Sequence, residues 1–253
     1  MTLKPGHKIY FASDFHLGVP DAESSLKREK KIVRWLDHVS QDAAEIFLVG
    51  DIFDFWFEYK RAVPRGYTRL LGKISELTDR GIPVHVFTGN HDMWIFDYLT
   101  SECGVKLYRQ SIERTWNDKK FMIGHGDGLG PGDHGYKFIK KVFANPVCQW
   151  LFARLHPNFG IWLARSLSGY SRSTTGDKDS VFLGEDKEWL IIYCKEVLQT
   201  QHFDYFIFGH RHLKMDITLR ENSNYINLGQ WLNGSSYAVF DGEKTELLDF
   251  EKA

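Results

Sequence analysis

Five times along the chain, a short apolar run ends and metal-binding side chains follow at once. The runs are residues 9–12, 46–49, 84–87, 121–123 and 205–208. Alternation of strands with helices is typical of parallel sheets, whose ligands gather at the carboxyl ends of the strands. We therefore expect the side chains that follow the five runs to converge at one edge of a sheet. They are Asp14 and His16, Asp51 and Asp54, Asn90, His91 and Asp92, His125 and Asp127, and His210 and His212.

The spacing of apolar residues predicts an α/β architecture for the first half of the chain. Ile32, Trp35, Leu36 and Val39 recur at helical intervals, which predicts a helix over residues 24–39, and a similar pattern predicts one over 67–79. After His212 the pattern changes to short β runs at 225–228, 237–240 and 246–250, separated by Asn-Gly and Asp-Gly. These runs predict an antiparallel meander at the C-terminal end.

Length, charge, cysteine content and the distribution of apolar residues indicate the kind of protein to expect. A chain of 253 residues suits one large domain, spanning residues 1–253, with room for a sizeable insertion. The 32 Lys and Arg residues balance the 33 Asp and Glu residues, so we expect no nucleic-acid partner. Three scattered cysteines without a CxxC pair indicate reduced thiols. Residues 1–8 show no apolar signal region and no stretch reaches about 18 apolar residues, so we expect a cytoplasmic protein.

Residues 134–176 differ from the rest of the chain, because they contain Lys, Arg and many aromatic residues but no Asp or Glu. Pro146 and Pro157 divide this stretch into short predicted helices. One interpretation is a helical hairpin packed on the core, with its cations in solvent. The other is a basic, aromatic cap that receives an anionic amphiphile or rests on an anionic membrane surface. The absence of acidic residues favours the second interpretation.

Each metal-binding residue could alone be a helix cap or a hydrogen-bonded core residue. As a set, carboxylates, an amide and imidazoles suit manganese, iron or zinc. An Asp that faces two ions could bridge a pair about 3.5–4 Å apart, and such a pair activates a water for attack on phosphorus. We expect Asp92 and Asp127 to orient ligand imidazoles rather than to bind metal.

The five stretches resemble, in order, the motif set of the calcineurin-like metallophosphoesterases. The motifs are Asp14-x-His16, Gly50-Asp51-x-x-Asp54, Gly89-Asn90-His91-Asp92, Gly124-His125 and Gly209-His210-x-His212. The resemblance implies a two-sheet sandwich flanked by helices that binds two divalent cations, with manganese expected and iron or zinc as alternatives. It implies one metal held by Asp14, His16, Asp51 and His212, and a second held by Asp51, Asn90, His125 and His210.

The same resemblance implies roles for two further residues. His91 would protonate the leaving oxygen or stabilise its charge, and Asp54 would orient that imidazole and keep it protonated. These two are the expected catalytic residues.

Within that superfamily, the chain looks most like the UDP-2,3-diacylglucosamine pyrophosphohydrolases of lipid A biosynthesis. The similarity lies in residues 13–17 and 53–57, in His125-Gly126-Asp127-x-Leu129, and in a cap between the fourth and fifth motifs. It implies a helical cap over residues 134–185 that holds acyl chains, with Trp150 and Trp162 among the substrate-binding residues. Known members of this group carry Arg where this chain has His91. A sister group acting on another phosphoester is therefore an alternative.

The resemblance also implies polar substrate contacts at the two ends of the cap. Asp133 matches an Asp of the extended His-Gly-Asp motif, although it could equally cap a helix that starts near Tyr136. Ser171, Thr175 and Lys178 match a spacing of sugar- and phosphate-binding residues, although a solvated Ser/Thr-rich loop would have the same composition.

The leading hypothesis is a two-metal phosphohydrolase that cleaves the diphosphate of UDP-2,3-diacylglucosamine to lipid X and UMP. Its expected partners are this nucleotide-sugar lipid and, by peripheral contact, the cytoplasmic face of the inner membrane. One alternative is a metallophosphoesterase for another phosphodiester or nucleotide diphosphate. The other is a non-catalytic scaffold, which would be expected to lose metal ligands that this chain retains.

Overall fold

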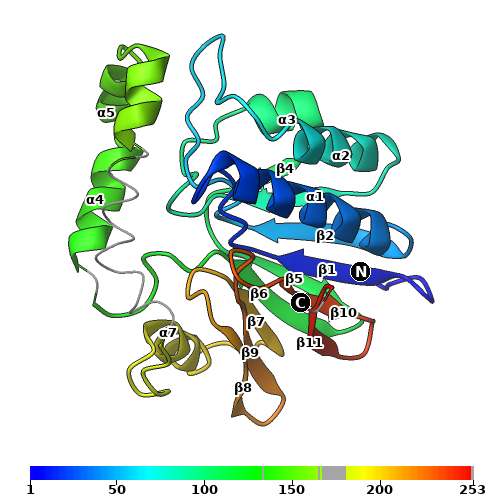
Figure 1. The fold of residues 1–253 in the computed structure, drawn as a ribbon. Helices are drawn as coiled ribbons and strands as arrows, with labels where there is room; N and C mark the ends of the chain where they lie inside the picture. Colours follow the sequence, from blue (N-terminus) through cyan, green and yellow to red (C-terminus); the bar gives the residue numbers. More distant parts are fainter. Residues whose placement is uncertain (133, 165, 167–180, 252–253) are drawn as a thin grey trace.

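Helices, two sheets and a further helix are stacked in four layers in the computed structural model, which describes residues 1–132, 134–164, 166 and 181–251 (Figure 1). One apolar cluster lies between the first helices and the first sheet, a second lies between the sheets, and a third lies beneath the last helix. The side chains that follow the strands lie at one edge of this sandwich.

The first sheet has the strand order β11-β10-β1-β2-β3-β4. Strands β1 to β4 run parallel, whereas β10 and β11 form an antiparallel hairpin beside β1. The strands of this sheet are β1 (Lys8–Ala12), β2 (Ala43–Val49), β3 (Val84–Phe87), β4 (Lys106–Tyr108), β10 (Ser236–Phe240) and β11 (Thr245–Asp249).

The second sheet has the order β5-β6-β7-β9-β8. Strands β6, β7 and β9 run parallel, and β5 and β8 flank them in the antiparallel sense. The strands are β5 (Ile112–Trp116), β6 (Lys119–Gly124), β7 (Tyr205–Phe208), β8 (Lys214–Arg220) and β9 (Ser223–Leu228).

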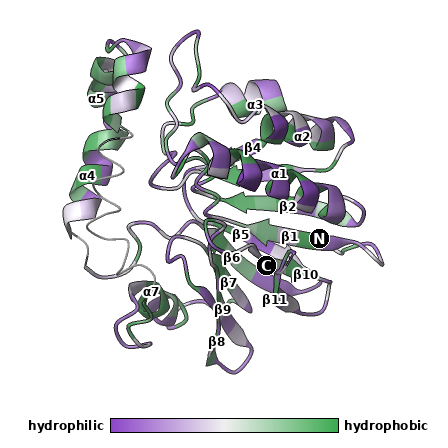
Figure 2. Ribbon diagram, in the orientation of Figure 1, coloured by the Kyte–Doolittle hydropathy of each residue, from purple (hydrophilic) through white to green (hydrophobic). Residues whose placement is uncertain are grey.

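Alternation along the strands builds the layers. In β1, Ile9 and Phe11 face the second sheet, whereas Tyr10 and Ala12 face the helices, as expected for a strand buried on both faces. Apolar residues accordingly concentrate on the strands in Figure 2. The helices that cover the sheets are α1 (Ala22–Val39), α2 (Thr68–Asp79), α3 (Tyr98–Cys103) and α7 (Trp189–Val197).

Two further helices, α4 (His134–Ala144) and α5 (Pro146–Phe152), stand beside the sandwich at the left of Figure 1. Asn145 separates them and caps α5 by accepting from the amide of Val147 over 2.8 Å, and residues 157–164 are again helical. These helical residues, 134–164, are called the cap below. Phe152 packs against Phe57 and Trp94, which anchors the cap to the loops after β2 and β3.

The predicted α/β fold with two sheets flanked by helices is confirmed, but the predicted C-terminal meander is wrong in one respect. β10 and β11 form the expected hairpin, whereas β9 belongs to the other sheet, where it runs parallel to β7. The Asn-Gly turn therefore joins two sheets instead of two paired strands. Among the helices that the structure describes, none has the length and apolar character needed to cross a membrane.

Candidate metal centre

The metal-binding side chains of the five stretches lie just past the carboxyl ends of parallel strands. β1, β2 and β3 are neighbours in the first sheet, and β6 and β7 are neighbours in the second. Hydrogen bonds continue beyond the strands: the amide of Asp14 donates to Gly50 O and that of Gly209 donates to His125 O, both over 3.1 Å. The loops are thus held side by side, where parallel sheets usually bind ligands.

Asp14, His16, Asp51 and His212 form the first group of candidate ligands. Nε2 of His16 lies 3.0 Å from Nε2 of His212 and 3.7 Å from Oδ2 of Asp51. Oδ1 of Asp14 lies 3.3 Å from Nε2 of His212. A cation about 2.1 Å from each donor would place neighbouring donors roughly 3.0–3.4 Å apart, so this group has close to the dimensions of a coordination shell.

Asp51, Asn90, His125 and His210 form the second group. Oδ1 of Asn90 lies 3.0 Å from Nδ1 of His210 and 3.2 Å from Nε2 of His125. That His125 nitrogen is also 3.3 Å from Oδ2 of Asp51. One oxygen of Asp51 therefore faces both groups, as a bridging ligand must.

The two groups of candidate ligands together are called the cage below. Asp14 and Asp51 each use one carboxylate oxygen to accept a backbone amide and turn the other toward the cage. Asp51 accepts the amide of His91 on Oδ1 over 2.9 Å, and Asp14 accepts the amide of His210 on Oδ2 over 3.0 Å. The other Asp14 oxygen, Oδ1, is buried and makes no hydrogen bond within the described residues; Nε2 of His212 lies 3.3 Å and Nε2 of His16 lies 3.7 Å from it. A divalent cation between these groups would compensate the buried carboxylate charge. The residues present therefore fit a metal, and their O/N donor set suits manganese, iron or zinc.

The backbone at the ligands is strained. Non-glycine residues rarely adopt a left-handed conformation, which costs about 1–2 kcal/mol each, and where it persists it often marks a functional site. The candidate ligands with positive φ are Asp14 (55°), His16 (43°), Asp51 (50°), His210 (70°) and His212 (49°).

Glycines beside the ligands leave room for this close packing. A Cβ on Gly209 would lie 2.5 Å from Oδ2 of Asp14, and one on Gly89 would lie 2.6 Å from the backbone nitrogen of Asp51. Both distances are below van der Waals contact, so these two positions need glycine for the loops to approach each other.

Electrostatics bind the cage together. Burial alone would lower the pKa of His16 and of His125, but the neighbouring carboxylates, above all Asp14 for His16 and Asp51 for His125, raise both to about 10. The pKa of Asp51 is lowered: burial opposes this, but the charge of His125 outweighs it. Burial and the charge of His125 lower the pKa of His210 to about 4. The protonation states of the cage residues therefore depend on one another, and a bound cation would change them.

His91 and Asp54 lie beside the first group. Nδ1 of His91 is 3.1 Å from the backbone oxygen of Asp54, and Oδ1 of Asp54 is 3.7 Å from Nδ1 of both His91 and His16. A proton on Nδ1 of His91 is therefore held by Asp54 O, which leaves Nε2 as the atom that can exchange a proton with substrate.

Asp92 and Asp127 do not make the contacts expected of them. Fully buried Asp92 accepts the amides of Gly89 and Ile52, each over 2.7 Å, and so ties the loop after β3 to the loop after β2. Burial and the charge of Asp51 raise its pKa to about 7. Asp127 accepts Tyr136 Oη over 2.6 Å and lies 2.6 Å from Nζ of Lys140. Within the described residues, the hydrogen bonds of these two carboxylates thus position the backbone and α4 instead of ligand imidazoles.

Sequence reasoning missed Arg211, which stands between two candidate ligands. Its guanidinium pairs with Glu188 through Nε at 2.8 Å and Nη2 at 2.9 Å, and both side chains are almost fully buried. Arg211 Nη2 also donates to Val181 O over 3.0 Å. The loop after β7 is therefore clamped to α7 and to the chain that leaves the cap. In the sequence, this pair is indicated only by an Arg within the fifth motif and an acidic residue upstream of it.

A cavity of about 460 Å³ opens between the metal centre and the cap. Asn90 and His91 line its inner end. The rest of its wall is mostly apolar and comes from the loops after β2 and β3 and from the cap: Phe55, Trp94, Ile139, Phe143, Phe152 and Leu163.

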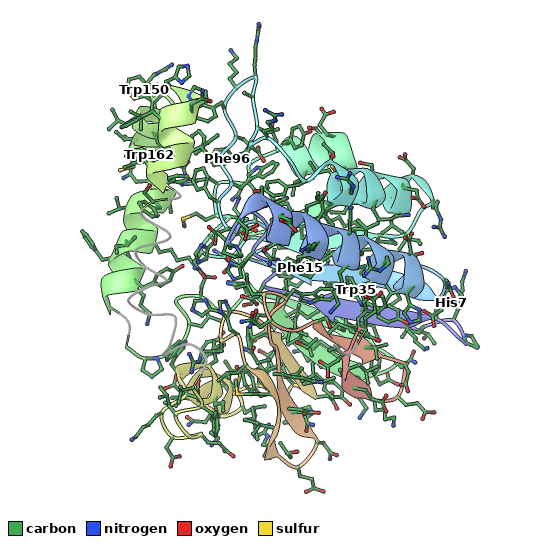
Figure 3. All side chains as sticks on the ribbon, viewed as in Figure 1. His7, Phe15, Trp35, Phe96, Trp150 and Trp162 are labelled. Carbon is green, nitrogen blue, oxygen red and sulfur yellow. The ribbon has the colours of Figure 1, made fainter. Side chains whose placement is uncertain are left out.

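The structure places the predicted substrate-binding residues differently from the metal-binding ones. Trp150 and Trp162 are 56% and 61% exposed and do not line the cavity next to the metal centre. Figure 3 shows both on the cap, well away from the core residues Phe15 and Trp35. Asp133, Ser171, Thr175 and Lys178 lie outside the described residues.

The chain resembles a known protein family and several known proteins. The family model described as calcineurin-like phosphoesterase matches residues 7–214. A UDP-2,3-diacylglucosamine hydrolase from Porphyromonas gingivalis is 38% identical over 256 residues, which cover 96% of this chain and 98% of the relative. A protein of the same name from Actinobacillus succinogenes is 25% identical over 225 residues, covering 89% and 92%. A dimetal phosphatase from Danio rerio aligns with a TM-score of 0.48 at 12% identity, covering 97% and 96%.

Proposed function

The chain belongs to the calcineurin-like phosphoesterase family and is a metal-dependent phosphohydrolase, and we propose that its substrate is UDP-2,3-diacylglucosamine, cleaved at the diphosphate to lipid X and UMP. The observation that carries this proposal is the mostly apolar cavity that leads from Asn90 and His91 to the cap. A small phosphodiester would need no such cavity, whereas a diacylated sugar has acyl chains to bury.

The seven clustered residues would hold two divalent cations, and we propose manganese for both. Asp14, His16 and His212 would bind one, Asn90, His125 and His210 the other, and Asp51 would bridge them. When bound, such a pair lowers the pKa of a water molecule and neutralises phosphate oxygens.

The remaining residues supply proton transfer and orientation. His91 would donate its Nε2 proton to the leaving oxygen, because Nδ1 faces the backbone oxygen of Asp54 and its ring borders the cavity. Lys140, from α4, would contact the diphosphate from the cap side, since it lines the same cavity. The apolar walls would exclude water from the reacting phosphate.

We also propose that the cap rests on the cytoplasmic face of the inner membrane, from which its lipid substrate must come. Exposed apolar patches on a protein mark interaction surfaces, and nearby cations favour an anionic one. Arg154 lies 4.6 Å from the ring centre of Trp150, so a cation accompanies an exposed aromatic ring. The exposed large apolar residues of the described part of the cap that do not line the first cavity are Phe138, Val142, Val147, Trp150, Leu151, Phe159 and Trp162.

The test of the substrate compares two variants of α4 in detergent. Ile139→Glu puts a charge into the wall of the cavity, whereas Val142→Glu makes a similar change three residues away, outside the cavity wall. We expect Ile139→Glu to lower kcat/KM for UDP-2,3-diacylglucosamine at least tenfold, since it opposes burial of an acyl chain. Val142→Glu should change it less than threefold. Hydrolysis of bis(p-nitrophenyl) phosphate should be equal in both.

Mass spectrometry of the products would identify UMP and lipid X. Failure of the manganese-loaded wild-type protein to release UMP from this lipid would reject the substrate, and selective hydrolysis of small diesters would favour the alternative phosphodiesterase.

Membrane contact has its own measurement, co-sedimentation with vesicles. Trp150→Ala combined with Trp162→Ala should reduce binding to vesicles containing phosphatidylglycerol, while leaving turnover of detergent-solubilised substrate within threefold. Equal sedimentation of wild type and variant would reject this surface as the docking site.

A further inference from the structure

A second cavity, of about 380 Å³, lies next to the candidate ligand His125. The two cavities share one lining residue, Lys140, and each contains a candidate ligand: Asn90 in the first and His125 in the second. Oδ1 of Asn90 and Nε2 of His125 are 3.2 Å apart. The two cavities therefore adjoin neighbouring residues of the same ligand group.

The two cavities differ in chemistry. The first is walled mainly by aromatic and aliphatic side chains, whereas the lining of the second includes the polar residues Thr88, Gln110 and Ser111 and the charged residues Arg109, Asp127 and Lys140. Tyr193 and Leu129 contribute an aromatic and an aliphatic face to the second cavity. Hydroxyl and amide groups beside flat apolar surfaces are suited to a nucleoside, which offers carbonyl acceptors and ribose hydroxyls on a planar base.

Lys140 connects the two cavities. An ammonium group carries three N–H donors, and in the described contacts two of them reach Asp127, one at its backbone oxygen over 2.9 Å and one at its carboxylate at 2.6 Å. The Asp127 carboxylate also accepts the hydroxyl of Tyr136 over 2.6 Å. Lys140 is thus held by two contacts where the cavities meet, which is where a bridging diphosphate would carry its charge.

Arg109 stiffens the rim of the second cavity. Its guanidinium donates to Ile95 O over 2.6 Å and to Met93 O over 3.2 Å, so the β4–β5 connection that carries Gln110 and Ser111 is tied to the loop after β3. This wall of the second cavity is therefore fixed to the metal-binding loop after β3.

We propose that this second cavity, lined by Thr88, Gln110 and Ser111, binds the uridine monophosphate half of the substrate while the apolar cavity binds the acylated half. The proposal rests on the proposed function, because it divides one substrate between two sites. Two of the assigned side chains, Thr88 and Gln110, would hydrogen-bond the nucleoside and would not contact inorganic phosphate.

The test uses the manganese-loaded full chain and measures the equilibrium Kd of UMP and of inorganic phosphate by calorimetry. Inorganic phosphate is expected to bind at the metal centre only. The ratio of its Kd to the Kd of UMP therefore measures the contribution of the nucleoside to binding. We expect Gln110→Ala and Thr88→Val each to raise the Kd of UMP at least fivefold and to leave that of phosphate within twofold. The control is Gln199→Ala, an exposed glutamine after α7 that lines neither cavity, which should change neither value.

Turnover of UDP-2,3-diacylglucosamine separates this proposal from the proposed function. If the wild type releases UMP from the lipid but the Kd of UMP is equal in wild type, Gln110→Ala and Thr88→Val, the second cavity is not the nucleotide site. Equal Kd values of the wild type for UMP and for phosphate would also show that the second cavity is not the nucleotide site. If the wild type does not cleave the lipid, the proposed substrate is wrong, and a raised UMP Kd in the variants would still support the nucleotide site.

Discussion

Asp51 connects the two groups of candidate ligands through one atom. Its Oδ2 lies 3.7 Å from Nε2 of His16 and 3.3 Å from Nε2 of His125, while Oδ1 is fixed by the amide of His91. The residue has φ of 50° and is almost fully buried. Two cations that share this oxygen would offset the free-energy cost of both the strained backbone and the buried charge.

Asp51→Asn removes the charge and keeps the shape. We expect it to lower the manganese content, measured by mass spectrometry after dialysis, from two ions per chain to one or none, and to lower kcat at least 10³-fold because the activated water is lost. Asp216→Asn, on strand β8 away from the cage, is the control and should retain both ions. Full metal content in Asp51→Asn would contradict a bridging role.

His91→Gln separates metal binding from proton transfer. His91 borders the cavity but belongs to neither ligand group, so we expect unchanged metal content and a loss of 10²–10⁴-fold in kcat/KM, the usual contribution of general acid catalysis. The variant should also lose the high-pH decline of the pH–rate profile, since no titrating acid remains. An unaltered profile would remove His91 from the proton-transfer step.

Metal affinity should rise with pH. Carboxylates raise the pKa of His16 and His125 to about 10, so in chelator-treated protein both rings are protonated near neutrality. A metal binds neutral imidazole, so its binding must displace these protons, and the apparent affinity increases as the pH rises toward 10. Calorimetry in buffers of different ionisation enthalpy should detect proton release at pH 7. No release would mean that these rings are already neutral.

At the scale of elements, the loop after β7 depends on an ion pair that its neighbours supply. Arg211 stands between His210 and His212, and Glu188, at the start of α7, holds it with two hydrogen bonds. Glu188 Oε1 also accepts the amide of Leu183 over 3.0 Å. The pair therefore fixes two metal-binding histidines relative to the chain that returns from the cap.

Replacing Arg211 alone should lower the free energy of unfolding more than replacing both Arg211 and Glu188. Arg211→Met leaves Glu188 buried without its cation, and we expect a loss of about 3–5 kcal/mol in the free energy of unfolding, measured in urea. Arg211→Met combined with Glu188→Leu should recover at least half of that loss. The single variant should also bind manganese more weakly. Equal stability of wild type and Arg211→Met would show that the pair does not support the loop.

The convergence of the five stretches was predictable because each ends a strand of parallel type, and strand direction fixes the edge at which they meet. Helix α1 was predictable from its apolar spacing, and the structure extends it only to Ala22, where Asp21 caps it by accepting the amide of Ser24 over 2.8 Å. β9 was assigned to the wrong partners, because local turn residues do not reveal which sheet a strand joins. The apolar cavity could not be assigned to Trp94, Phe143 and Phe152, since their meeting depends on how the cap docks.

At the scale of the whole molecule, the sandwich brings two cavities of different chemistry to one cage. The cage residues come from both sheets, so metal binding joins the two halves of the fold. A ligand that binds only the folded state stabilises it by about 2.7 kcal/mol at a hundred times its Kd. For a chain of this size, that corresponds to a rise in Tm of roughly 5–10 °C.

We therefore expect manganese at this excess to raise the Tm of chelator-treated protein by roughly 5–10 °C in a calorimetric scan. Asp51→Asn is the matched variant and should show less than half of the rise, because it lacks the shared ligand. An equal rise in both proteins would place the stabilising ions elsewhere.

We infer that two cations share Asp51 where the sheets meet. Anomalous diffraction at the manganese edge, from crystals grown with manganese, measures this directly. We expect two peaks of comparable height about 3.5–4 Å apart, each about 2.0–2.3 Å from Oδ2 of Asp51. A single peak, or two peaks of which only one lies beside Asp51, would contradict it.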